Sequence, residues 1–186
     1  MTLPDAGTMS TMAQYARHRE ALWRLMATVV GPVTDDLVGR AADGRLGRQV
    51  ADATHFVGDT NPFADVIPSR RDVFERGRSV DADEERAALR ADLADARDES
   101  LGAVFDAAAG NCADEAAAWE VGDAEAAKAA RMTQFASLRE QLAHLTDWCV
   151  ALHRRATTEP ARMVARLVAA HLSLESGVDV KARLRP

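Results

Sequence analysis

The sequence predicts an all-α fold: a single-domain helical bundle of about seven helices with an irregular central loop. Apolar residues recur at intervals of three and four over most of the chain, which is the spacing of a helix that is buried on one side. Alanine is abundant, while aromatic residues make up only 5% of the 186 residues, and this composition favours close-packed helices. Runs of β-branched residues, which are typical of strands, are short and scattered.

We expect one domain to span residues 1–186, with frayed tails at residues 1–10 and 178–186. The chain is 47% hydrophobic, which is enough for a core, and 28% charged. Residues 1–10 have no basic stretch ahead of an apolar one, so no signal peptide is predicted there. No apolar run approaches the roughly 20 residues of a membrane span, so stable membrane insertion is not expected.

The first helix is predicted to begin at Ser10 or Thr11, because either side chain can accept a hydrogen bond from the first turn. It ends at Gly31-Pro32, since glycine favours a helix end and proline cannot continue the hydrogen-bond ladder. Arg19 lies on the face that is expected to be buried. The apolar residues of this face are Met12, Tyr15, Leu22, Trp23, Met26 and Val29.

Two short helices and a loop are predicted next. Thr34 is the expected cap of the second helix, which ends at Asp43-Gly44. A third helix is expected over residues 46–56. Residues 58–71 contain one glycine and two prolines, and we predict a loop that packs on the bundle.

The middle of the chain is predicted to hold two more helices. Residues 83–96 form a charged surface helix, whose few large apolar residues are Leu89 and Leu93. A further helix covers residues 101–119 and is expected to kink or end at Gly110-Asn111.

The C-terminal half carries the clearest helical pattern. Asp123 is the predicted cap of a long helix, and Thr158 with Pro160 starts the last helix, which ends at Gly177. The long helix has an apolar seam at intervals of three and four, made of Phe135, Leu138, Leu142, Leu145, Cys149 and Leu152.

Charge and motif content argue against several classes of function. The formal net charge is −6 and no dense run of Lys or Arg occurs, so nucleic-acid binding is not expected. No histidine follows a glutamate by three residues, and phosphate loops and nucleophile elbows are missing. We therefore expect no catalytic residue, no metal and no cofactor. Cys112 and Cys149 lie among apolar residues and are expected to stay reduced, while His144 and His171 lie near apolar helix faces.

Several short motifs follow one another in a characteristic order. Trp119 stands ahead of Gly122-Asp123, and His144-Leu145 precedes Trp148 in the next helix. The first helix carries Arg-Glu-Ala-Leu-Trp from Arg19, and the last helix carries Pro160, Ala165, Leu167, Leu172, Leu174 and Glu175. In this order and spacing the sequence resembles the TorD-like redox-enzyme maturation chaperones over most of its length.

The resemblance implies a cytoplasmic chaperone that binds the twin-arginine signal peptide of a molybdopterin redox enzyme, its apo form, or both. Such a chaperone assists cofactor loading, delays export and carries no cofactor of its own. Its implied partners are the signal peptide and the catalytic subunit of a molybdopterin oxidoreductase, and a homodimer is left open.

The resemblance also implies where the peptide binds. An arginine pair followed by an apolar segment needs acidic groups beside an apolar groove. Of the family's hinge motif, E-P-x-D-H, only Asp98 is matched here, and its aromatic loop is best matched by Val73-Phe74. The implied peptide-binding residues are Asp72, Val73, Phe74, Asp98, Glu99 and Phe105, with Asp95 and Trp119 as further candidates.

Two other interpretations were weighed. A regulator-like helical module that binds a ligand or a protein, with no catalytic activity, would also fit the composition. As a DNA-binding helix-turn-helix, however, residues 31–44 would place Asp35 and Asp36 against phosphate. A helical di-metal enzyme is disfavoured, because the Glu-x-x-His ligand pairs of that class are missing.

Overall fold

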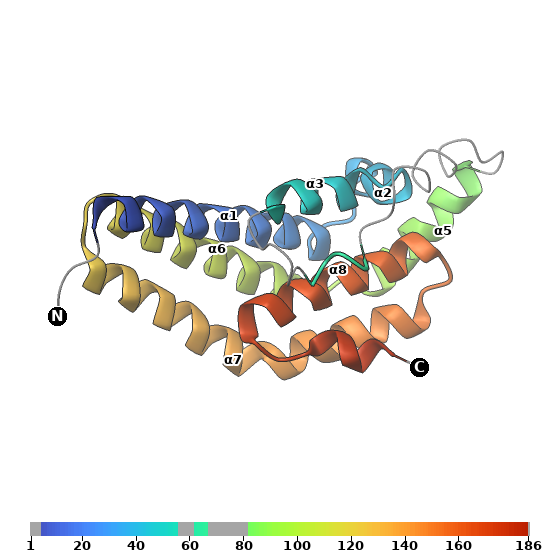
Figure 1. Ribbon diagram of the computed structural model, residues 1–186. Coiled ribbons are helices and arrows are strands. Elements are labelled where there is room, and N and C mark those ends of the chain that lie inside the picture. The colour runs from blue at the N-terminus through green and yellow to red at the C-terminus, as the bar shows by residue number, and fades with distance from the viewer. Residues whose placement is uncertain (1–4, 56–61, 67–81, 186) are drawn as a thin grey trace.

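The computed structural model describes residues 5–55, 62–66 and 82–185 and confirms the all-α prediction (Figure 1). Within these residues there are seven α-helices, one short 3₁₀ helix and no strand. None of the described helices is both long and apolar enough to cross a membrane. The α-helices are α1 (Ala6–Val30), α2 (Asp35–Ala42), α3 (Arg45–Ala53), α5 (Ala82–Asp95), α6 (Glu99–Glu120), α7 (Ala124–Arg155) and α8 (Glu159–Ser176); the 3₁₀ helix is η2 (Val180–Leu184).

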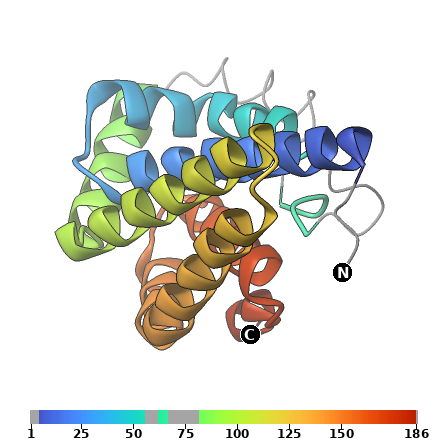
Figure 2. The ribbon, with the colours of Figure 1, turned by 90° about the vertical axis from the view of Figure 1, so that its left-hand side faces the viewer.

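The four long helices follow an up-and-down path. Helix α1 packs mainly against α6, α6 against α7, and α7 against α8. Each of the last three runs back along the helix before it, and α2 and α3 lie across the C-terminal half of α1 (Figures 1 and 2). The connections from α6 to α7 and from α7 to α8 are short, as is usual between antiparallel neighbours, whereas residues 31–98 separate α1 from α6.

The predicted caps of three helices are confirmed. The side chains of Thr34, Asp123 and Thr158 accept hydrogen bonds from the first turns of α2, α7 and α8. Gly177 ends α8 with a φ of 70°, a left-handed conformation that favours glycine.

The N-terminal boundary of α1 corrects the prediction. The helix begins at Ala6 rather than at Ser10 or Thr11, because Asp5 Oδ1 accepts a hydrogen bond from the Thr8 amide at 2.9 Å. The expectation of a frayed tail over residues 1–10 is therefore wrong for residues 6–10. An acidic cap is favoured there, since carboxylates stabilise helix N-termini.

The C-terminal boundary corrects a second prediction. Residues 178–186 were expected to fray, but Val180 and Leu184 of η2 are buried in the core. Lys181 Nζ donates to the Pro62 carbonyl at 2.6 Å and lies 2.7 Å from Asp65 Oδ1. The segment therefore belongs to the fold and holds the short turn at residues 62–66.

Other local predictions are confirmed in part. Phe63 and Val66 are buried, so the described part of the central loop packs on the bundle as expected. Helix α3 ends at Ala53, three residues before the predicted end, and α6 runs through Gly110 without a break. In the apolar seam of α7, Phe135 is 42% exposed and Leu142 is partly buried, while Leu138, Leu145, Cys149 and Leu152 are buried as predicted.

Candidate functional site

A group of charged and polar side chains is buried where α1, α6, α7 and α8 meet. Arg19 is 1% exposed, and its guanidinium binds Glu175 through two donors, at 3.0 and 2.9 Å. It also donates to Glu115 Oε2 at 2.7 Å and to Gln134 Oε1. Gln134 in turn donates to Glu175 Oε2 at 2.8 Å. We call Arg19, Glu115, Gln134 and Glu175 the core charge cluster.

The core charge cluster is internally satisfied. Burial lowers the pKa of Arg19, but the charge of Glu175 outweighs this effect and raises the pKa overall. Burial likewise raises the pKa of Glu175, and Arg19 reverses this effect, so both groups stay charged. Each of the three guanidinium nitrogens donates to an oxygen of the cluster and the group is 1% exposed, so it is not accessible to a ligand. The cluster is therefore interpreted as part of the scaffold.

Burial keeps two side chains near the cluster, Cys112 and His171, in their neutral forms at neutral pH. Burial raises the pKa of the Cys112 thiol to about 12, and Cys112 Sγ donates to Gln134 Oε1 at 3.3 Å. His171 is wholly buried, with its ring 4.2 Å from that of Trp23, and burial lowers its pKa to about 4. Neither of its ring nitrogens has a hydrogen-bond partner among the described residues. Neither side chain is placed to act as a nucleophile or a base at neutral pH.

A different arrangement is found where the α5–α6 connection meets the C-terminal half of α7. There a hollow of about 210 Å³ opens to solvent. We call it the hinge pocket; it is lined by Asp92, Asp95, Ala96, Arg97, Asp98, Trp148, Ala151, Leu152, Arg155 and Ala156. It combines carboxylates with an indole and small apolar groups, which is the combination expected for a basic and apolar peptide.

Two sequence-predicted residues, Asp98 and the further candidate Asp95, line the hinge pocket, and Asp98 has the more extensive contacts. It caps α6, because its Oδ1 accepts hydrogen bonds from the Ser100 amide at 3.0 Å and the Ser100 hydroxyl at 2.6 Å. Its Oδ2 lies 3.0 Å from His144 Nε2. The hydrogen bond from the Ser100 hydroxyl lowers the pKa of Asp98, so its carboxylate persists in mildly acidic solution.

The two other carboxylates of the hinge pocket differ in their contacts. Asp92 accepts hydrogen bonds from the backbone amides of Thr157 and Thr158 at 3.0 and 2.8 Å, and thereby ties α5 to the start of α8. Burial raises the pKa of Asp92, but these hydrogen bonds outweigh it and lower the pKa overall. Asp95 is exposed and has no hydrogen-bond or ion-pair partner among the described residues. It is the carboxylate that is most available to a ligand.

Trp148 lines the hinge pocket but was not among the predicted peptide-binding residues. Its Nε1 donates a hydrogen bond to the Ala96 carbonyl, so the indole fixes the α5–α6 connection against α7. It remains partly exposed, with its ring on the wall of the hinge pocket. The motif in which His144-Leu145 precedes Trp148 was the only sequence feature that singled out this tryptophan. His144 also contacts the hinge pocket, through its hydrogen bond with Asp98.

Of the other predicted site residues, one lies in the core, and the side chains of four fall outside the described part of the chain. Phe105 is wholly buried and packs against Trp23, with ring centroids 5.2 Å apart, so its predicted place in a peptide groove is corrected to the core. Glu99 opens α6, but its side chain lies outside the described part. Asp72, Val73 and Phe74 also lie outside the described residues.

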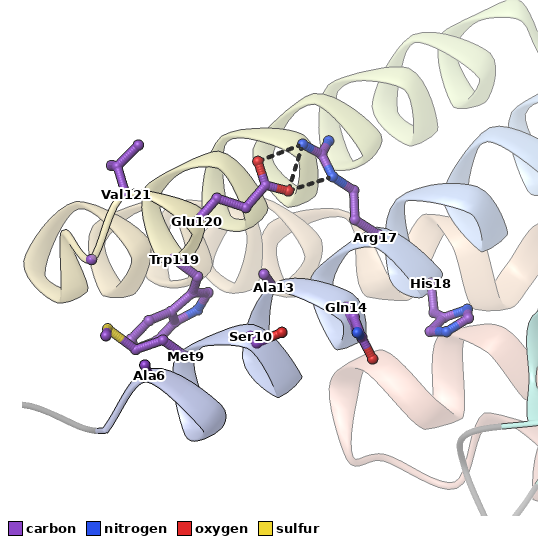
Figure 3. A pocket seen from close by; sticks show the side chains of 11 residues that line it. Ala6, Met9, Ser10, Ala13, Gln14, Arg17, His18, Trp119, Glu120 and Val121 are labelled. Atoms are coloured by element: carbon purple, nitrogen blue, oxygen red, sulfur yellow. Dashed lines mark hydrogen bonds and ion pairs between the residues drawn. The ribbon is translucent and has the colours of Figure 1, made fainter.

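Trp119 lines a hollow of about 620 Å³ at the opposite end of α6, beside the start of α1 (Figure 3). We call it the terminal hollow. Met9 packs beside the indole, and the Arg17 guanidinium lies 3.1 Å from Glu120 (Figure 3). Arg17 also pairs with Glu20 at 3.1 Å. Because Arg17 and Glu120 pair with each other, the terminal hollow offers a charged peptide fewer unpaired charges than the hinge pocket does.

The described residues contain no group of three or more His, Cys, Asp or Glu side chains that is arranged to hold a metal ion. Comparison of the chain with known families, with curated proteins and with solved structures finds no match.

Proposed function

We propose that this protein is a chaperone that binds the twin-arginine signal peptide of a molybdopterin redox enzyme in the hinge pocket. The observation that carries the proposal is the unpaired carboxylate of Asp95 beside the ionised Asp98 and the half-exposed indole of Trp148. In this proposal the protein acts in the cytoplasm by binding alone. Its partner is the catalytic subunit of the oxidoreductase, with that subunit's signal peptide.

The chemistry of the hinge pocket suits an arginine better than a lysine. A guanidinium offers planar, paired donors to a carboxylate and also stacks on an indole, whereas an ammonium is a hydrated point charge. The pocket carries three carboxylates against the guanidiniums of Arg97 and Arg155, which leaves one net negative charge. The alanine side chains and Leu152 between these groups provide an apolar wall for the segment that follows the arginine pair.

The proposal is tested by calorimetric titration of a synthetic twin-arginine signal peptide and of its Lys-Lys counterpart. We expect the Arg-Arg peptide to bind at least about five-fold more tightly, which corresponds to roughly 1 kcal/mol. Equal affinity for both peptides, or binding of neither, would refute the proposal. In that case the alternative of a helical module for another ligand or protein would be favoured.

Charge variants locate the binding site. Asp95→Asn and Asp98→Asn should each weaken Arg-Arg peptide binding about three- to ten-fold, because each removes one exposed or half-exposed carboxylate. Asparagine retains the cap at position 98, so α6 should remain intact. Asp106→Asn is the matched control, since Asp106 is exposed on α6 and does not line the pocket. Equal weakening by the control would place the peptide elsewhere.

A further inference from the structure

A long depression lies along α7 beside the C-terminal segment. Figure 1 shows this segment turning back after α8 and running along α7. Two hollows of about 600 and 220 Å³ meet here, because Arg139, Leu142 and Val178 line both of them. We call the combined depression the α7 groove.

The floor of the α7 groove is apolar and accessible. Phe135 is 42% exposed and Val178 is 51% exposed, although both sit among apolar neighbours such as Leu138 and Leu142. Most large apolar side chains of the described residues are buried, and Phe135 and Val178 are among the few that are exposed. An apolar strip with a polar rim is typical of a surface that binds another protein.

The rim of the α7 groove is basic. Arg139, Arg154 and Arg183 are exposed, and none of them makes an ion pair or a hydrogen bond with a described residue. Two carboxylates share the groove: Asp179 accepts a hydrogen bond from the Ala182 amide and caps η2, whereas Asp147 is exposed. In a chain of formal net charge −6, this concentration of unpaired guanidiniums is a local excess of positive charge.

We propose that the α7 groove binds an amphipathic helix of a partner protein, with acidic side chains flanking its apolar face. Helices of this kind dock in grooves through apolar residues spaced three and four apart. Arg139 and Arg154 are separated by fifteen positions of α7, or about 22 Å along its axis. That length matches about four turns of a partner helix whose carboxylates meet the arginines at both ends.

This inference goes beyond the proposed function, because the α7 groove and the hinge pocket use different stripes of α7. The hinge pocket is lined by Trp148, Ala151 and Leu152, while the groove is lined by Leu142, Thr146 and Val150. A twin-arginine segment carries the same charge as the groove's rim and is therefore disfavoured there.

The test uses a fluorescent, synthetic helical peptide of about 18 residues, built from Leu, Ala and Glu with leucines spaced three and four apart. Its binding to the full chain is measured by anisotropy. We expect saturable binding of this peptide and at least about ten-fold weaker binding of the counterpart with Lys in place of Glu. A scrambled peptide of the same composition, which lacks the apolar stripe, should also bind weakly.

Variants of the protein assign the binding to the groove. Arg139→Glu should weaken binding of the acidic peptide about five-fold, and Asp147→Asn should strengthen it about two-fold. Arg48→Glu is the matched control, because Arg48 is exposed on α3 and makes no ion pair with a described residue. Phe135→Ala should weaken binding with little effect on folding, since the side chain is already exposed.

Each of the following outcomes would overturn the inference: no saturable binding of the acidic peptide, equal binding of its Lys counterpart, or equal effects of Arg139→Glu and Arg48→Glu. Co-sedimentation with anionic phospholipid vesicles, in the absence of peptide binding, would also overturn it in favour of a membrane surface. Asp95→Asn should leave binding of the acidic peptide unchanged, so failure here is distinguishable from failure of the proposed signal-peptide site.

Discussion

The core charge cluster and the hinge pocket both contain carboxylates, but these are buried and paired in the cluster and accessible to solvent in the pocket. In the cluster, Arg19 and Glu175 are almost fully buried, and every guanidinium nitrogen of Arg19 has a partner. In the hinge pocket, Asp95 is exposed and unpaired among the described residues. The difference separates two roles: charges that are satisfied within the chain hold helices together, and charges left unsatisfied at the surface are available to a ligand.

The largest expected effect comes from breaking the core charge cluster. Arg19→Met leaves Glu115 and Glu175 buried without their main cation, so the free energy of unfolding should fall by about 3–5 kcal/mol. Denaturant unfolding followed by circular dichroism measures this loss.

The control replaces the whole cluster with apolar side chains. The variant Arg19→Met/Glu115→Leu/Gln134→Leu/Glu175→Leu removes every buried charge together, and such replacements are often neutral or stabilising. Its stability should return to within about 1 kcal/mol of the parent protein. If the quadruple variant is as unstable as Arg19→Met, the loss arises from packing rather than from an unpaired charge.

The next largest effect concerns pH. The pKa of His171 is about 4 in the folded protein, where burial disfavours the charged ring, against 6.5 for an exposed histidine. The unfolded chain therefore binds more protons between these values, so stability is complete above about pH 6.5 and is lost as the pH falls toward 4. The loss amounts to about 3 kcal/mol.

His171→Leu should flatten this pH dependence. The groups that face His171 include Trp23, Arg19 and Glu175, and none of these is changed by the substitution. Denaturant midpoints measured from pH 7 to 4.5 in both proteins give the difference, with His55→Gln as a control at an exposed histidine. Parallel curves for the parent and His171→Leu would contradict the assignment.

A smaller effect is expected from the hinge pocket itself. Trp148→Leu removes the hydrogen bond to Ala96 and the aromatic wall of the pocket. Binding of the Arg-Arg peptide should weaken about ten-fold, while the free energy of unfolding falls by only about 1 kcal/mol. Calorimetric titration and denaturant unfolding measure the two quantities. A stability loss as large as that of Arg19→Met would show that Trp148 belongs with the scaffold.

The smallest expected effect is that of salt. Raising ionic strength shortens the screening length, so binding of the Arg-Arg peptide should weaken a few-fold between about 0.1 and 1 M salt. The core charge cluster is shielded from ions by burial, and the free energy of unfolding should change little in this range. Titrations and unfolding curves at both salt concentrations test the contrast, and salt-independent binding would remove the electrostatic basis of the proposed site.

The sequence predicted those features of the fold that depend on neighbouring residues. Thr34, Asp123 and Thr158 cap their helices as expected, because a cap needs only the side chain and the turn that follows it. The start of α1 was misplaced because Asp5 and Ser10 are both acceptable caps. The hydrogen bond from the Thr8 amide to Asp5 and the packing of Met9 and Ala13 against α6 and α7 both favour the earlier one.

The candidate site was harder to predict than the fold. Phe105 lies at helical spacing, and such a residue has the same pattern whether its face meets the core or a groove. Trp148 was not predicted as a site residue, because its contact with Ala96 joins residues 52 positions apart and leaves no local sequence pattern. Asp98 could be predicted as a site residue because it matches one position of the family's hinge motif, which the resemblance implies is part of the peptide-binding site.

The bond between Arg19 and Glu175 has a consequence for how this chain is made. The two residues are 156 positions apart, and a ribosome that adds about 5–20 residues per second needs roughly 8 to 30 s to travel from one to the other. During that interval the guanidinium lacks its bidentate partner and must remain hydrated. The bundle can therefore close around Arg19 only after Glu175 has been synthesised.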